Sequence, residues 1–199
     1  MVDQIKSRRG MLGLRAHDPA KAWPGYTLFA PSGAGDRVYL VDMAGEVFHE
    51  WRVGHSPGLY GYLTERGTLV FNGRILEEPT RFISTGPWKA GSISEIDWHG
   101  NVLWEVRHPD HHHDGRLLRN GNVILLCLAR LPDELAARVR GGQAGSEHEG
   151  AIHADYLVEM TNEGDVVWEW RVWEHLDPET HPITAVQDLR HEWTHGNTV

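Results

Sequence analysis

The sequence YLVDMAGEVFHEW at residues 39–51 decides the fold, because closely similar stretches return twice further along the chain. These are SEIDWHGNVLWEV at 94–106 and LVEMTNEGDVVWEW at 157–170. Each copy consists of an apolar strand, a polar turn with glycine, and a strand in which apolar residues alternate. Glycine supplies the positive φ that a tight hairpin needs, so the repeat predicts three β-hairpins of one kind. The turn glycines are Gly45, Gly100 and Gly164.

A second hairpin pattern follows the first two copies. It reads LTERGTLVF at 63–71 and LLRNGNVILL at 117–126. Two hairpins make about four short strands, which is the size of a propeller blade. We therefore predict an all-β chain with a β-propeller fold of about three blades. The predicted divisions are an N-terminal arm at 1–22 and blades at about 23–90, 91–155 and 156–199.

Three blades do not close a ring, since propellers typically have four to eight. The last residues, HGNTV, also read like the middle of a strand. We expect the chain to be half of a six-bladed propeller. The second half would come from the same polypeptide, from a second chain, or from another copy in a homo-oligomer.

Composition excludes several classes of function. The 199 residues carry a formal net charge of -9, without the basic face of a nucleic-acid-binding protein. No run of eighteen apolar residues is present, so we expect no membrane span. The N-terminus lacks the apolar core of a signal peptide, which makes the cytoplasm the expected location. The single cysteine, Cys127, lies in an apolar run and is predicted to be a buried strand residue.

Three patches resemble one known family. PGYTLFAP at 24–31, followed by the first repeat copy, is similar to the first blade of bacterial aryl-sulfate sulfotransferases. HHHDGRLLRNGNVILL at 111–126 resembles that family's paired-histidine strand and its Asn-Gly turn. WTHGN at 193–197 resembles the family's W-x-H-x-N signature. The resemblance runs in patches from about residue 24 to the end.

This resemblance implies a six-bladed propeller with its active site in the central channel. Family members move a sulfuryl group from a phenolic sulfate to a phenol through a sulfated histidine. If this chain does the same, we expect it to require no cofactor. The resemblance puts His112 or His113, together with His195, at the channel. There they would bind or polarise the oxygens of a small aromatic or anionic substrate, while the family's nucleophilic histidine lies in later blades.

The histidine run at the start of a predicted inner strand is the main candidate site. Alternate residues of a strand face the same side, so His111 and His113 are expected to point together and His112 away. Their chemistry would be anion binding, acid–base work or metal ligation. Asp114 would orient an imidazole and fix its tautomer.

A second candidate group lies near the C-terminus. His195 begins another apparent inner strand, and Asn197 would share its face as a donor to an oxyanion. We expect Trp193 to line an aromatic pocket and Arg116 to clamp an anion. Weaker candidates are His55, in the matching loop of the first blade, and His191, beside Glu192. His148 and His153 flank the loop at 141–155 and would approach the channel mouth.

Two other classes of function stay open at this point. The chain has 14 histidines, so His111, His113 and His195 are candidate ligands for Fe, Zn, Cu or Mn in a hydrolase, lyase or oxidoreductase. No compact metal motif such as H-E-x-x-H supports that alternative. A propeller can also be a binding scaffold without catalysis, because a fold does not imply a function.

Overall fold

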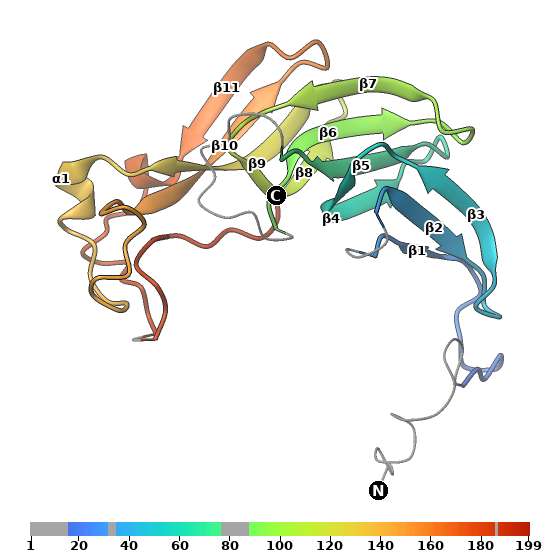
Figure 1. Cartoon of the computed structure of the whole chain (residues 1–199), viewed down its shortest axis with the longest axis horizontal. Coiled ribbons are helices and arrows are strands. Elements are labelled where there is room, and N and C mark those ends of the chain that lie inside the picture. Colours follow the sequence, from blue (N-terminus) through green and yellow to red (C-terminus); the bar gives the residue numbers. More distant parts are fainter. Residues whose placement is uncertain (1–15, 32–34, 77–87, 186) are drawn as a thin grey trace, which may run out of the picture.

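The described residues form three antiparallel sheets that follow one another along an arc (Figure 1). The computed structural model describes residues 16–31, 35–76, 88–185 and 187–199. The first sheet contains β1 (Thr27–Phe29), β2 (Arg37–Val41) and β3 (Val47–Arg52). The second contains β4 (Ser56–Leu63), β5 (Leu69–Arg74), β6 (Gly91–Ile96) and β7 (Val102–Arg107). The third contains β8 (His111–Leu117), β9 (Val123–Arg130), β10 (His153–Met160) and β11 (Val166–Arg171).

Within each sheet the strands are paired in sequence order, as in a propeller blade. The predicted all-β fold, built from units of about four strands, is confirmed. The helical structure described is short: α1 (Asp133–Ala136) and a 3₁₀ turn at Val172–Glu174. In the described part of the chain, no helix is long and apolar enough to cross a membrane. Residues 1–15 of the predicted N-terminal arm lie outside the described residues.

The three repeat copies form the hairpins β2–β3, β6–β7 and β10–β11, as predicted. In each turn, the side-chain oxygen of the first residue accepts backbone N–H groups from later residues of the same turn. Asp97 Oδ1 accepts the backbone N–H groups of His99 and Asn101, both at 2.8 Å, and Gly100 has φ 89°. Asp42 serves the first turn in the same way, and Thr161 serves the third.

The sheets divide the chain differently from the predicted blade ranges. The hairpin β4–β5 follows the first repeat copy but pairs through β5 with β6, so it belongs to the second sheet. In the same way, β8–β9 pairs through β9 with β10. The second and third sheets therefore begin at residues 56 and 111. The sequence repeat therefore predicted the position of each turn. Which sheet the hairpins β4–β5 and β8–β9 join depends on strand pairing, which the repeat does not show.

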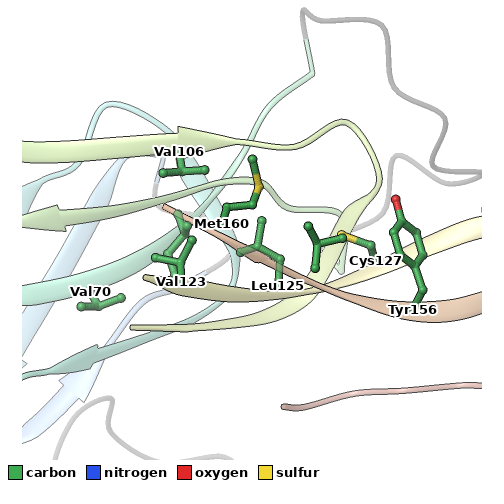
Figure 2. Close-up of a cluster of buried hydrophobic side chains, with 9 residues drawn as sticks. Val70, Val106, Val123, Leu125, Cys127, Tyr156 and Met160 are labelled. Carbon is green, nitrogen blue, oxygen red and sulfur yellow. The ribbon is translucent and has the colours of Figure 1, made fainter. Parts of the chain in front are cut away.

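Apolar side chains fill the spaces between neighbouring sheets. Trp51 is 1% exposed and donates its indole N–H to the Asp97 carbonyl oxygen at 3.0 Å, joining the first sheet to the second. Figure 2 shows the contact between the second and third sheets, where Val70 and Val106 face the apolar side chains of β9 and β10. Cys127 belongs to this cluster and is fully buried, as predicted.

The strands β4 and β8, each the first strand of its sheet and at its edge, share one irregularity. In β8, His111 pairs with Cys127, but the next pair is Gly115 with Leu125, so extra residues bulge out between them. His113, inside the bulge, has φ 48°, a left-handed conformation that is uncommon for residues with a side chain. The equivalent residue of β4 is Leu59, with φ 93°. A bulge of this kind re-aims side chains, and in β8 it does so within the histidine run.

Candidate histidine site

A pair of adjacent histidines lies at the start of β8, next to the start of β10. The Nδ1 atoms of His112 and His113 lie 2.7 Å apart. On its other side, Nε2 of His112 lies 3.1 Å from Oδ1 of Asp155, at ion-pair distance but without the alignment of a hydrogen bond. His112 is fully buried and Asp155 is 6% exposed. The three side chains form a row from a buried carboxylate to a half-buried imidazole.

This arrangement differs from the prediction that His111 and His113 share a face. The prediction assumed a regular strand, whereas the bulge and the positive φ of His113 break the alternation. His113 therefore lies beside His112. His111 is fully buried, and its Nε2 donates to the carbonyl oxygen of Asp114 at 3.3 Å.

Two buried carboxylates hold the C-terminal segment 194–199 against the histidine pair. Oδ2 of Asp155 accepts the backbone N–H of Gly196 at 2.7 Å. Oδ2 of Asp114 accepts the hydroxyl of Thr198 at 2.6 Å and the N–H of Val199 at 3.2 Å. The carboxylate of Asp114 therefore fastens this segment, which differs from its predicted role of orienting an imidazole.

The docked segment brings His195 next to His113. Their ring centroids are 5.9 Å apart, and the planes cross at 70°. Nδ1 of His195 donates to Oε2 of Glu192 at 3.0 Å. The pKa of Glu192 is raised above its usual value, mainly by burial, although the neighbouring His195 opposes this shift. The strand predicted to begin at His195 is not formed in the described residues. Side-chain contacts from Asp155 and Asp114 hold this segment instead.

The electrostatic environment keeps His113 neutral near pH 7. Burial, followed by the nearby His112 and His195, lowers the pKa of His113 to about 4. Burial is also the largest of the causes that lower the pKa of His111, to about 3. A neutral imidazole has one bare nitrogen, so His113 can accept a proton at this half-buried position. His111 is also neutral at this pH, but its side chain is fully buried and cannot contact a substrate.

The three candidate metal ligands are not gathered in one place. His113 and His195 are neighbours, whereas His111 is hydrogen-bonded within β8. Throughout the described ranges, no group of three or more His, Cys, Asp or Glu side chains is arranged to hold a metal ion. The described residues therefore do not bring His111, His113 and His195 together as one ligand set.

The three residues predicted to contact substrate, Trp193, Asn197 and Arg116, differ in burial and in their partners. Trp193 is 6% exposed and packs in a core cluster, where its indole N–H donates to the His181 carbonyl oxygen at 2.7 Å. It was expected to line an aromatic pocket, but it is part of the core. Asn197 is exposed and donates to the carbonyl oxygen of His195 at 3.1 Å. Arg116 bonds to Asp114 at 3.2 Å, and its guanidinium lies 4.1 Å from the ring centroid of Tyr60.

The weaker histidine candidates lie in two places. His148 and His153 have ring centroids 6.0 Å apart, and Nδ1 of His153 bonds to the carbonyl oxygen of His191 at 3.3 Å. This group adjoins the site, because His191 precedes Glu192. His55 precedes β4, and its Nε2 lies 3.3 Å from Oε2 of Glu105 in β7 of the second sheet.

Sequence reasoning did not single out Asp155. Its signal is present in HADYLVEM, residues 153–160, where a carboxylate stands near the start of an otherwise largely apolar strand. A buried carboxylate requires partners, and here they are the Gly196 N–H and the His112 ring.

Comparisons with known proteins place the chain in a family. The arylsulfotransferase (ASST) family profile matches residues 35–199. Among solved structures, the chain is similar to a protein of unknown function from Bacteroides caccae, with 14% identity and a TM-score of 0.42. That match covers 74% of this chain and 40% of the other, so the chain spans less than half of that relative's length. The comparison with curated proteins found no match. On the family match over residues 35–199, the chain belongs to the arylsulfotransferase family, whose fold is a β-propeller.

Proposed function

We propose that this protein transfers a sulfuryl group from an aryl sulfate to a phenolic acceptor, with His113 and His195 as its acid–base and anion-binding pair. The observation that carries the proposal is the pairing of two imidazoles in different settings. His113 is half-buried and neutral, with a pKa lowered by burial to about 4. His195 is exposed and bonded to the carboxyl group of Glu192 at 3.0 Å.

The net reaction breaks the S–O bond of the donor and forms an S–O bond to the acceptor oxygen. One proton leaves the acceptor hydroxyl, and one proton reaches the departing phenolate. His113 is the group suited to accept the first proton, because its neutral ring offers a lone pair at pH 7. Its position beside His195 allows one substrate to contact both rings, whose centroids are 5.9 Å apart.

His195 is suited to the negative charge of the sulfuryl oxygens. In its protonated form, Nδ1–H faces Glu192 and Nε2–H donates to the anion. Hydrogen bonds between a cationic donor and an anion are among the stronger ones in proteins. Fastening of the segment 194–199 by Asp155 and Asp114 gives this donor a fixed position before substrate arrives.

The family resemblance implies that His112 could bind substrate oxygens, but its position in the structure does not suit that role. It is fully buried, so it has no surface with which to contact substrate. Its effect on the reaction must pass through His113, its neighbour at 2.7 Å.

The experiment that tests the proposed function uses the purified protein with 4-nitrophenyl sulfate as donor and phenol as acceptor. We expect 4-nitrophenol and phenyl sulfate to form together, with phenyl sulfate identified by mass spectrometry. Omitting phenol should slow the release of 4-nitrophenol. Folded protein that forms no phenyl sulfate and does not bind the donor would overturn the proposal.

A further inference from the structure

We propose that Asp155 is a positioning residue that determines, through His112, which nitrogen of His113 carries the proton. In this arrangement Nδ1 of His113 is protonated and Nε2 is bare. The effect on catalysis rests on the proposed function, whereas the position of the proton can be measured without any reaction.

The first step concerns the contact between the two rings. The Nδ1 atoms of His112 and His113 are 2.7 Å apart, which is hydrogen-bond distance. Two bare nitrogens at this distance would repel each other, and so would two N–H groups. One Nδ1 therefore carries a proton and the other accepts it.

The second step decides which ring donates. An ionised carboxylate only accepts hydrogen bonds, and Oδ1 of Asp155 lies 3.1 Å from Nε2 of His112. The carboxylate favours a proton on that Nε2. A neutral His112 then has a bare Nδ1, which accepts the Nδ1–H of His113. The remaining nitrogen of His113, Nε2, is left with its lone pair.

This state opposes the intrinsic preference of the side chain. A neutral histidine in water favours the Nε2–H form, so a Nδ1–H His113 requires a partner that holds the proton there. The row Asp155–His112–His113 supplies that partner from a fully buried ring. A contact that holds one ring nitrogen of a functional histidine commonly fixes its tautomer.

The third step shows how the arrangement can be inverted without removing a heavy atom. Oδ2 of Asp155 accepts the Gly196 N–H at 2.7 Å. In the Asp155→Asn variant, only the amide oxygen can keep that bond, so the amide nitrogen must face His112. The amide N–H then lies against Nε2 of His112 and disfavours a proton there, so the His112 proton moves to Nδ1. His113 must accept at Nδ1 and carry its own proton on Nε2.

The inversion removes the lone pair from the nitrogen that the proposed reaction uses. Loss of one positioned acid–base group lowers rates by about 10²- to 10⁴-fold. We expect Asp155→Asn to lower kcat by about 10²-fold or more, and Asp155→Glu, if it folds, to restore part of the rate.

The deciding experiment is NMR of the full chain with ¹⁵N-labelled histidines, using long-range ¹H–¹⁵N correlations that distinguish the two tautomers. His113→Asn identifies the His113 signals. We expect Nδ1–H on His113 in the native protein and Nε2–H in Asp155→Asn. The matched control is Asp114→Asn, because Asp114 fastens the same segment through Thr198 and Val199 but lies outside the row; its His113 should keep Nδ1–H.

Two results would overturn this inference. The first is Nε2–H on His113 of the native protein, which would mean that His112 donates rather than accepts. The second is an unchanged His113 in a folded Asp155→Asn variant. If that variant does not fold, the native spectrum alone decides. A protein with the expected tautomer but no sulfuryl transfer would contradict the proposed function and leave the role of Asp155 in fixing the tautomer standing.

Discussion

His112 and His113 are consecutive residues of β8, yet their Nδ1 atoms lie only 2.7 Å apart. In a regular strand their side chains would point to opposite faces of the sheet. The left-handed backbone of His113, with φ 48°, turns its ring back toward its neighbour. The site therefore depends on a local departure from strand geometry and on the C-terminal segment that is docked against it.

The His195→Gln variant should weaken the binding of the aryl sulfate. It removes the ring that the proposal assigns to the anion, while the fastening contacts of Asp155 with Gly196 and of Asp114 with Thr198 stay in place. Loss of one charge-assisted hydrogen bond is worth roughly 1.5–3 kcal/mol, or about ten-fold or more in affinity. Equilibrium binding of 4-nitrophenyl sulfate measures it, and native affinity in this variant would remove His195 from the anion site.

The rate should depend on pH through His113 in a particular direction. Its pKa is lowered from 6.5 to about 4 by burial and by the neighbouring His112 and His195. The base form is therefore present above about pH 4 and is lost as the pH falls through that value. We expect the acid limb of kcat/KM to lie near pH 4 rather than near 6.5. NMR titration of His113 gives the same quantity directly, and a midpoint near 6.5 would show that His113 is not desolvated.

The fully buried His111 should make stability depend on pH. Its pKa is lowered to about 3, mainly by burial, so the unfolded chain binds more protons between pH 6.5 and 3. The stabilisation is complete above about pH 6.5, and the free energy of unfolding falls as the pH drops through this window, by at most about 1.4 kcal/mol per pH unit from this group.

His111→Gln tests this dependence, because the amide can still donate to the Asp114 carbonyl oxygen but does not titrate. Urea unfolding of both proteins at several pH values should show a shallower pH dependence in the variant. Identical slopes would contradict the account of His111, whatever the difference in absolute stability.

A side chain at Gly115 should destabilise the fold through crowding in β8. A Cβ at this position would lie 2.8 Å from Cδ2 of Leu125 and 2.9 Å from Oδ1 of Asn72. Overpacking of this kind typically costs about 1–3 kcal/mol. Gly115→Ala is therefore expected to lower the midpoint of urea unfolding clearly. Gly25→Ala, where nothing lies within 4 Å of the added Cβ, is the matched control, and equal midpoints for the two variants would refute the close packing of β8.

The sequence predicted the regular part of this molecule well. Gly45, Gly100 and Gly164 marked the outer hairpins because a tight turn needs their positive φ, and Cys127 was placed correctly in a buried strand. The histidine run does begin a strand, β8. Local patterns were sufficient wherever local geometry was regular.

The details of the site were beyond such patterns. The bulge at His113 changes which histidines lie together, and the residues of the histidine run do not predict a bulge. The contact between His112 and Asp155 joins residues from two different strands, and it depends on how β8, β9 and β10 pair. Trp193 was misassigned because an aromatic residue beside a histidine fits a pocket and a core equally well.

The most direct test of the central claim compares sulfuryl transfer in the native protein with that in His113→Asn and His99→Asn. Asparagine tolerates the left-handed backbone of position 113, and His99 lies exposed on the β6–β7 turn, so both variants should stay folded. The measured quantity is the initial rate of phenyl sulfate formation from 4-nitrophenyl sulfate and phenol. We expect a loss of about 10²- to 10⁴-fold in His113→Asn and a native rate in His99→Asn. A native rate in a folded His113→Asn variant would contradict the assignment of the reaction to this histidine site.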